Sequence, residues 1–473
     1  MTSFALHPSS WSHPFRNIDV KISGKPLEAL PWRESFDTTA DREERNADGT
    51  EYPLYTQKRS LPGDPGPCST LLMKDLLVPT STGKIKHILM TYDPSSLNDS
   101  AVVNSYLSAF RKMAEHLPDA RFTIIAGRNH SRVQIENTLK DLLEKGKIKD
   151  LSRFNVVMHF GKISIWAQDS VLVQGNTLLQ LDRGLEQFGL DDGAVAPIVA
   201  GANPEFESKD FPSTSMAGGN TVSSPDYLLI GSDAVLGLAG QLGEYPQESC
   251  VILGKFVETV PGESKEGLIA RVLQTRFPLQ KILVIGSPDE AGVMVQPSFH
   301  IDMAVTLLGK DSRTGKPVAL VGDPSIAVEA IRKTRRENAD LYRAVNLDLK
   351  KTMDPPDDPL AELEGMANPR WRKHFDDVAK ALEQEGFLVE RIPHLGKKGY
   401  AHRLPWITYN NVLIDEKRVF MPVFGFPPLD DSAKALYEKY GYEVIPVDSV
   451  GITSGQGALN CITKILEREL PQA

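Results

Sequence analysis

The sequence predicts a mixed α/β fold, and three observations support this prediction. Short apolar runs of strand length alternate with stretches in which apolar residues recur at helical spacing. One pair of expected strands, residues 411–414 and 419–423, is separated only by the polar turn Asp415-Glu416-Lys417-Arg418, which indicates a hairpin rather than a purely parallel sheet. Apolar residues make up 41% of the 473 positions, which is enough to fill a large core.

The alternation begins near residue 84 and continues to the C-terminus. The expected strands span residues 84–92, 121–126, 154–159, 171–173, 281–285, 389–392 and 442–447. The expected helices carry their apolar residues within 102–113, 133–143, 269–277, 375–387 and 436–440. Each of these helices is followed by a strand, as repeated α/β units require.

Two regions depart from this rhythm. Residues 1–80 are rich in charged residues, proline and glycine and show little apolar periodicity, so we expect an irregular N-terminal extension. Residues 81–473 are expected to form one folded domain. Within it, the basic run 332–336 and the Pro/Asp-rich stretch 354–359 predict a partly helical insertion at about residues 309–372.

Charge and cysteine content exclude several classes of protein. The chain has 53 Lys and Arg against 62 Asp and Glu, a formal net charge of −9, which argues against a nucleic-acid partner and suits a small cationic substrate. No run of about 18 apolar residues and no secretory signal pattern occurs, so we expect no membrane partner and a cytoplasmic location. The three cysteines, Cys68, Cys250 and Cys461, are too far apart in sequence for a C-x-x-C metal site, and their number is odd. We therefore expect no metal site and no disulfide framework.

Polar residues occur at points where the chain is expected to be buried. Asp169 lies inside an apolar stretch and needs a cationic or hydrogen-bonding partner there. In extended backbone, His300 and Asp302 would point to one face and their apolar neighbours into the core. Phosphate-loop, dinucleotide, zincin and serine-hydrolase motifs are absent.

A glycine-rich segment near the C-terminus contains the third cysteine. Cys461 follows Ser454-Gly455-Gln456-Gly457, where the backbone allows a ligand to approach closely. We expect residues 464–468 to begin a helix, whose N-terminus would favour the thiolate. The turn Gly218-Gly219-Asn220 is expected to pack against such a site. Each feature alone also fits a structural role: a buried thiol acting as a small apolar group, a hydrogen-bonded core histidine, or a turn.

Taken in order, these motifs resemble those of the guanidine-modifying, or pentein, superfamily, whose members include agmatine and peptidylarginine deiminases. The residues that carry the resemblance are Trp166-x-Gln168-Asp169, Gly218-Gly219-Asn220, His300-x-Asp302 and Gly457-x-x-x-Cys461-Ile-Thr. The resemblance spans roughly residues 85 to 470 and implies a ring of five mixed α/β repeats (ββαβ units) around a central site, so that residues 81–473 would be the catalytic domain. Ala217 and Asn460 stand where agmatine-type enzymes commonly have Glu and His, and Gln168 stands where Arg is usual.

The resemblance also implies the roles of the site residues. Cys461 would be the nucleophile, His300 the general acid and base, and Asp169 and Asp302 the carboxylates that grip a guanidinium. Trp166, Gln168, Gly219 and Asn220 would line the substrate site. Two anions beside the thiol are expected to raise its pKa until the cationic substrate arrives.

The implied function is a guanidine deiminase that needs no cofactor. The expected product is a ureido group plus ammonia, and the substrate is an arginine side chain in a protein, free arginine or agmatine, with peptidyl-arginine preferred because of Gln168 and the long N-terminal extension. Two alternatives stay open: an amidinotransferase that uses the same site, and a non-catalytic guanidinium-binding scaffold. A homo-oligomer is also left open.

Overall fold

The computed structural model describes residues 76–471 apart from several short stretches. These stretches are 97–98, 182–188, 212–215, 242–248, 253–254, 259, 261–262, 291, 352–354 and 397–403. The side chains of residues 241–259 are also outside the description. The predicted extension at 1–80 and Cys68 therefore lie almost wholly outside the described residues.

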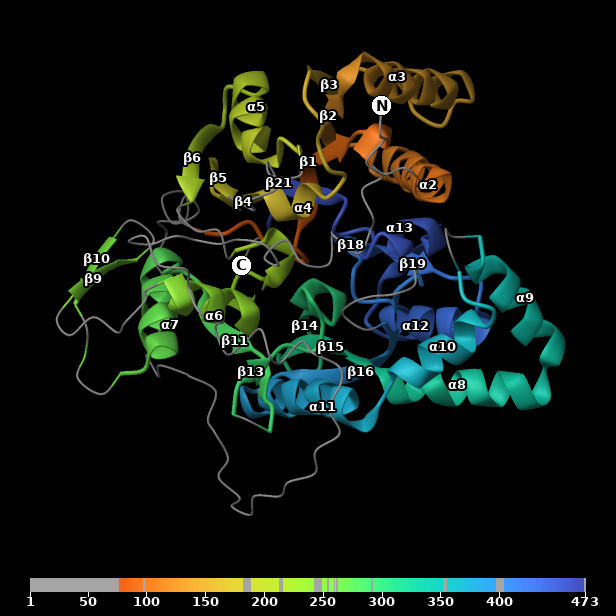
Figure 1. The fold of residues 1–473 in the computed structure, drawn as a ribbon. Coiled ribbons are helices and arrows are strands. Elements are labelled where there is room, and N and C mark those ends of the chain that lie inside the picture. The colour runs from red at the N-terminus through yellow and green to blue at the C-terminus, as the bar shows by residue number, and fades with distance from the viewer. Residues whose placement is uncertain are drawn as a thin grey trace, which may run out of the picture.

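Within the described residues, five sheets repeat one pattern, in which two antiparallel strands are followed by a third that runs parallel to the second (Figure 1). Their strands are β21 (Thr463–Glu469), β1 (Lys84–Tyr92) and β2 (Arg121–Gly127); β4 (Val171–Gln174), β5 (Thr177–Leu181) and β6 (Glu207–Phe211); β7 (Thr221–Ser223), β8 (Tyr227–Gly231) and β11 (Lys281–Ile285); β14 (Val305–Lys310), β15 (Pro317–Asp323) and β16 (Leu388–Leu395); and β18 (Leu413–Asp415), β19 (Arg418–Val423) and β20 (Glu443–Asp448). β3 (Phe154–His159) extends the first sheet and β17 (Ile407–Thr408) the fourth, while two short hairpins are β9 (Ser249–Ile252) with β10 (Lys255–Glu258) and β12 (Ser287–Pro288) with β13 (Met294–Val295).

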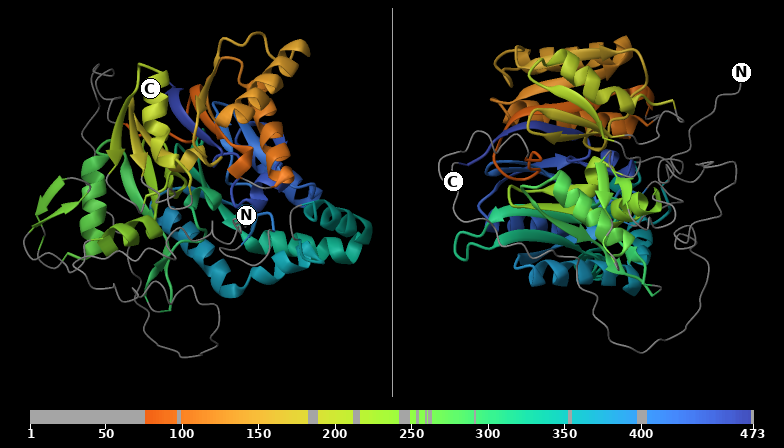
Figure 2. Two further views of the ribbon diagram at one scale, coloured as in Figure 1. Left: turned by 45° about the horizontal axis from the view of Figure 1, so that its top comes forward. Right: turned by 90° about the vertical axis from the view of Figure 1, so that its left-hand side faces the viewer.

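Helices connect the parallel strands, because a parallel pair needs a crossover connection. The helices are α2 (Ser100–His116), α3 (Arg128–Glu144), α4 (Ala167–Ser170), α5 (Val195–Ala202), α6 (Ser232–Gln241), α7 (Lys265–Arg276), α8 (Pro324–Glu337), α9 (Ala339–Leu349), α10 (Pro359–Met366), α11 (Pro369–Gln384), α12 (Pro427–Lys439) and α13 (Val450–Ser454). Single 3-10 turns are η4 (Pro94–Ser96), η6 (Asp192–Ala194), η7 (Gly218–Asn220) and η8 (Ile301–Met303). Figures 1 and 2 show α2 and α3 at the opposite end of the molecule from α8 and α11.

Three of the helices begin with the same local signal. Asp323, Asp358 and Asn368 cap α8, α10 and α11, and each side chain accepts a hydrogen bond from a backbone N–H of the first turn. A proline occupies the next position in all three, where its missing N–H costs nothing. These caps explain why the helices begin where they do.

Apart from the helix expected to begin at residue 464, every predicted strand and helix is present, and the predicted hairpin is confirmed by the antiparallel pairing of β18 with β19. The predicted buried face of α3 is partly wrong, because Val133 and Leu143 are exposed while Ile135, Leu139 and Leu142 are buried. The segment predicted as an insertion, 309–372, contains β15 as well as α8, α9 and α10; its status as an insertion stays a prediction.

One prediction fails at the C-terminus. Residues 464–468 form part of β21 and not a helix, because they pair antiparallel with β1 at the edge of a four-stranded sheet. Cys461 therefore precedes a strand and not the expected helix.

Apolar side chains fill the space between the sheets and the helices that cover them. Large side chains such as Tyr106, Phe110, Phe375 and Tyr437 have no exposed surface, and each contributes about 1.5–3 kcal/mol by burial. In the described part of the chain, no helix is both long and apolar enough to cross a membrane.

Candidate active site

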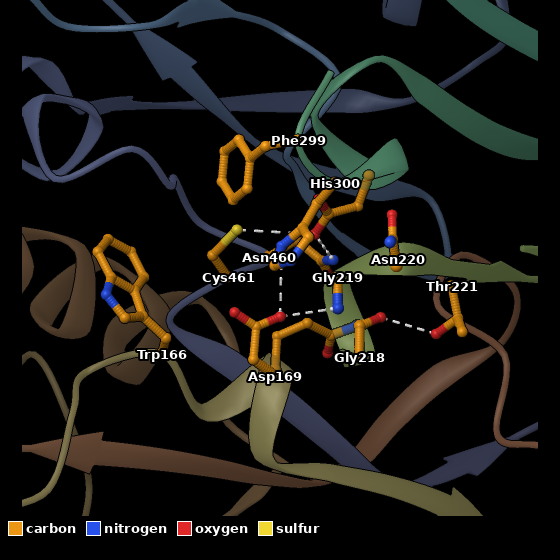
Figure 3. Close-up of polar contacts among 12 residues, drawn as sticks. Trp166, Asp169, Gly218, Gly219, Asn220, Thr221, Phe299, His300, Asn460 and Cys461 are labelled. Atoms are coloured by element: carbon orange, nitrogen blue, oxygen red, sulfur yellow. Dashed lines mark hydrogen bonds and ion pairs between the residues drawn. The ribbon is translucent and has the colours of Figure 1, made fainter. Parts of the chain in front are cut away.

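The candidate site is built from the residues that come just before the first strand of each of the five sheets. These are Asp169 in α4 before β4, Gly219 in η7 before β7, Asp302 in η8 before β14, Asn411 before β18 and Cys461 before β21. The same place in each repeat therefore supplies one or more polar groups, and this is how residues far apart in the sequence come together (Figure 3).

Cys461 is held by the side chain of Asn411 and by the backbone of α4. The Asn411 Oδ1 accepts hydrogen bonds from the N–H groups of Cys461 and Ala458, both at 3.1 Å, and its Nδ2 donates to the Cys461 Sγ at 3.1 Å. The Gln168 N–H donates to the Cys461 carbonyl oxygen at 3.1 Å. These contacts fix the position of the sulfur. Cys461 as a whole residue is 2% exposed.

Two carboxylates lie on either side of this network. The Asp302 Oδ2 accepts from Asn460 Nδ2 at 2.9 Å and lies 3.6 Å from the Cys461 Sγ. The Asp169 Oδ1 accepts from the Gly219 N–H at 2.8 Å and lies 3.5 Å from the His300 Nδ1. The structure thus brings the thiol, the imidazole and both carboxylates into one buried region.

Burial and like charge set the protonation of this region. Burial, followed by repulsion from the Asp169 carboxylate, raises the pKa of Asp302 to about 7. Burial, followed by the charges of Asp302 and Asp169, raises the pKa of the Cys461 thiol well above its ordinary value. The raised thiol pKa agrees with the expectation that two anions beside the sulfur disfavour the thiolate.

Two aromatic rings and a glycine border the sulfur. Figure 3 shows Trp166 and Phe299 around the Cys461 side chain, and the Phe299 ring centre lies 4.4 Å from that of His300. Gly457 separates the indole from the cysteine: a Cβ at this position would lie 2.4 Å from the Trp166 Cζ3 and 2.9 Å from the Cys461 Cβ. This close approach explains why the chain is glycine-rich here.

We predict that Gly457→Ala destabilises the protein by about 1–3 kcal/mol, the usual cost of overpacking. Either the indole or the cysteine backbone must shift, since both neighbours are buried. Urea denaturation measures the free energy of unfolding. Gly309→Ala is the matched control, because nothing lies within 4 Å of a Cβ there, and its effect should stay within about 0.5 kcal/mol. Equal stability of G457A and G309A would contradict this packing.

Gln168 and Asn220, predicted to bind substrate, contact the protein itself. The Gln168 Nε2 donates to the Gly218 carbonyl at 3.2 Å. The Asn220 Oδ1 accepts from Gln296 Nε2 at 2.9 Å and from the Ile301 N–H at 3.3 Å. Both side chains therefore brace neighbouring segments, and a direct role for either in binding stays a prediction.

The backbone around His300 differs from the expected extended strand. Residues 301–303 form the 3-10 turn η8, and His300 immediately before it has extended dihedral angles. The turn forms because the Asn220 Oδ1 holds the Ile301 N–H and the chain must then turn into β14. His300 and Asp302 still both face the site.

Sequence reasoning missed the contribution of Asn411. The feature that could have identified Asn411 is its position in the chain, because it precedes the first strand of a repeat just as Asp169 and Asp302 do. Among the described residues, no group of three or more His, Cys, Asp and Glu is placed to hold a metal ion.

Comparisons with known proteins support the resemblance predicted from the motifs. Residues 263–466 match a family model described as Porphyromonas-type peptidyl-arginine deiminase. This range contains His300, Asp302, Asn411 and Cys461, while Asp169 lies outside it. No curated protein sequence matches the chain.

Solved structures extend the likeness to most of the chain. An agmatine deiminase of C. jejuni has a TM-score of 0.51 and 13% sequence identity, and the match covers 84% of this chain and 97% of that chain. A putative arginine deiminase from Porphyromonas gingivalis has a TM-score of 0.50 at 13% identity over 82% of this chain and 97% of that one. A putative agmatine deiminase has a TM-score of 0.50 at 15% identity, covering 82% and 94%. At these identities the likeness shows a shared mixed α/β fold.

Proposed function

We propose that the protein is a guanidine deiminase, an amidine hydrolase that converts a guanidinium to a ureido group and releases ammonia. The observation that carries this proposal is the meeting of Cys461, His300, Asp169 and Asp302 in one buried region. We also propose that the five sheets form the five-unit ring implied by the resemblance, which would place these residues at its centre.

Recognition of the substrate would rest on the two carboxylates. A guanidinium is planar, permanently charged and presents a fork of N–H donors that matches carboxylate oxygens. The Oδ1 of Asp302 has no hydrogen-bond partner within the described part of the chain. An arriving guanidinium would satisfy this buried oxygen and neutralise the repulsion between Asp302 and Asp169.

The chemistry would proceed in two halves through a covalent intermediate. The Cys461 thiol gives up its proton to His300, its sulfur attacks the guanidinium carbon and a C–S bond forms. The C–N bond to one terminal nitrogen then breaks as His300 gives that nitrogen a proton, so that ammonia leaves. His300 then takes a proton from water, whose oxygen attacks the same carbon. The C–S bond breaks, the leaving sulfur takes up the remaining O–H proton to restore the thiol, and the carbon retains the new oxygen as the ureido carbonyl.

Substrate binding would itself activate the thiol. In the free protein, burial and two carboxylates keep the pKa of Cys461 high. A bound guanidinium brings a positive charge next to the sulfur and offsets the field of the two carboxylates, which favours the thiolate. The Asn411 Nδ2, 3.1 Å from the sulfur, would stabilise it further.

Peptidyl-arginine is the substrate we favour, because the match over residues 263–466 is to peptidyl-arginine deiminases. The test is a measurement of ammonia and ureido product with arginine, agmatine, methylated arginines and an arginine-containing peptide. We expect turnover of at least one of these, with the peptide fastest. Product that forms only when glycine or another amine is added would favour amidino transfer. Binding without any turnover would refute the proposed enzymatic activity and favour the non-catalytic guanidinium-binding scaffold.

A further inference from the structure

Asn460 is a buried amide in the candidate site to which the proposed chemistry gives no role. It comes directly before Cys461 in the chain and is 8% exposed. Its Nδ2 donates a hydrogen bond to the Asp302 Oδ2 at 2.9 Å. The side chain of Asn460 therefore joins the segment that carries the proposed nucleophile to one of the two carboxylates.

The backbone of Asn460 is held on both sides of its side chain. Its carbonyl oxygen accepts hydrogen bonds from the Thr463 N–H at 3.1 Å and from the Thr463 Oγ1 at 3.2 Å. Its N–H donates to the Asn411 carbonyl oxygen at 3.4 Å. With the backbone fixed and the side chain closely packed, the amide has little freedom to turn away from the carboxylate.

The amide makes the two oxygens of Asp302 different from each other. The Oδ2 accepts the hydrogen bond from Asn460 and lies 3.6 Å from the Cys461 Sγ. The Oδ1 is buried and has no hydrogen-bond partner among the residues that the structure describes. A buried acceptor without a partner is costly, so a ligand that brings an N–H donor is favoured there. Asn460 thus leaves the Oδ1 as the oxygen that can meet a guanidinium.

An amide suits this place because it is uncharged at every pH. A lysine or arginine here would pair with the carboxylate of Asp302 and compete with a cationic substrate. A neutral N–H donor instead favours the ionised carboxyl without cancelling its charge. It acts against burial and against the Asp169 carboxylate, both of which raise the pKa of Asp302.

Other titratable groups also surround Asp302. They are Asp169 on α4, His300 immediately before η8, Cys461 before β21 and Lys464 on β21. Replacing Asn460 with leucine leaves all of these groups in the chain. A change in the titration of Asp302 can then be assigned to the lost hydrogen bond.

We propose that Asn460 is a positioning residue that acts through Asp302: its amide holds one carboxylate oxygen beside the thiol, favours the ionised carboxylate and leaves the other oxygen for the guanidinium. This inference rests on the proposed function. Without the amide, Asp302 should take up a proton at a higher pH, so that fewer molecules can grip a guanidinium under neutral and mildly acidic conditions. Under alkaline conditions Asp302 is ionised with or without the amide, and the difference should disappear.

The experiment is a measurement of kcat/KM for N-acetyl-arginine amide between about pH 5.5 and 9.5 in the wild type and in Asn460→Leu, which is similar in size and has no donor. The pKa of Asp302, raised to about 7, places the acidic limb of the wild type. In the variant this limb should move up by about one pH unit, so that kcat/KM falls roughly tenfold near pH 6. Near pH 9.5 the two proteins should agree within about threefold.

Asn346→Leu is the matched control. Asn346, on α9, is 9% exposed, and its Nδ2 donates to the Asp358 Oδ1 at 2.9 Å. The substitution therefore removes the same kind of buried amide–carboxylate hydrogen bond outside the candidate site. It should leave the acidic limb where the wild type has it, even if the protein becomes less stable.

The outcomes separate this inference from the proposed function. An acidic limb that does not move in Asn460→Leu, a loss of the same size at every pH, or an equal shift in Asn346→Leu would each overturn the role of Asn460 while the enzyme remains active. If the wild type turns over no guanidino substrate at any pH, the proposed function itself fails, and this inference fails with it. Asn460→Ala takes the place of Asn460→Leu if the leucine variant does not fold, and the same results decide.

Discussion

Replacing Cys461 with serine is expected to lower kcat/KM for a guanidino substrate by about 10⁴-fold or more, because the nucleophile is lost and no other group can form the intermediate. The structure should persist. Serine is smaller than cysteine, and the Asn411 contacts to the backbone N–H groups of residues 458 and 461 do not depend on sulfur. Ammonia release measures the loss, and the thermal midpoint tests the fold.

Cys250→Ser is the matched control for this experiment, because it makes the same chemical change in β9, outside the candidate site. Its kcat/KM should remain within about twofold of the wild-type value. If Cys461→Ser retains wild-type turnover, Cys461 is not the nucleophile. If Cys250→Ser loses as much as Cys461→Ser, the assignment of Cys461 loses its support.

Asp302→Asn is expected to lower kcat/KM by about 10²–10³-fold, because a neutral amide cannot pair with the guanidinium and leaves part of it unsatisfied in a buried site. In the wild type, Asp302 must be ionised to accept these hydrogen bonds. Its pKa is raised to about 7 by burial and by Asp169, so kcat/KM should rise with pH through about 7. The variant should lose this acidic limb. Initial rates between about pH 5.5 and 9 measure both effects.

The stability of Asp302→Asn separates catalysis from folding. A carboxyl whose pKa is higher in the folded state stabilises the protein when protonated and loses that contribution as pH rises from its unfolded value near 4 to about 7. At pH 8 the asparagine variant should therefore unfold at a temperature no lower than the wild type. Asp415→Asn is the control: Asp415 is equally buried but pairs with Arg418 and the Ile85 N–H, so its loss should lower stability without this change in pH profile. A parallel loss of activity and stability in Asp302→Asn would contradict the account.

Much of the fold could be predicted from the sequence because local pattern and tertiary structure agree there. Residues 84–92 have the apolar run of a buried strand and form β1 with those bounds. The hairpin at 411–423 is marked by its polar turn and forms between β18 and β19. The motifs around Asp169, Gly219, Asp302 and Cys461 could be found because polar residues and glycines interrupt apolar stretches there and match the motifs of a known superfamily.

The errors arise where tertiary contacts override local preference. Residues 464–468 contain Lys, Ile, Leu, Glu and Arg, all compatible with a helix, and pairing with β1 makes them a strand. The turn at 301–303 depends on Asn220, which is 81 residues away from Ile301 in sequence. The hydrogen bond from Asn411 to the sulfur crosses 50 residues, and the sequence alone gives no distance between them.

The central claim is that the Cys461 sulfur forms a bond to the guanidinium carbon, and mass spectrometry of the Cys461 peptide after rapid acid quench tests it most directly. With N-acetyl-arginine amide as substrate, the predicted adduct has the mass of the probe less one ammonia. Its amount should rise and fall with turnover. Turnover with Cys461 unmodified at every time point, or with the adduct on another residue, would contradict the claim.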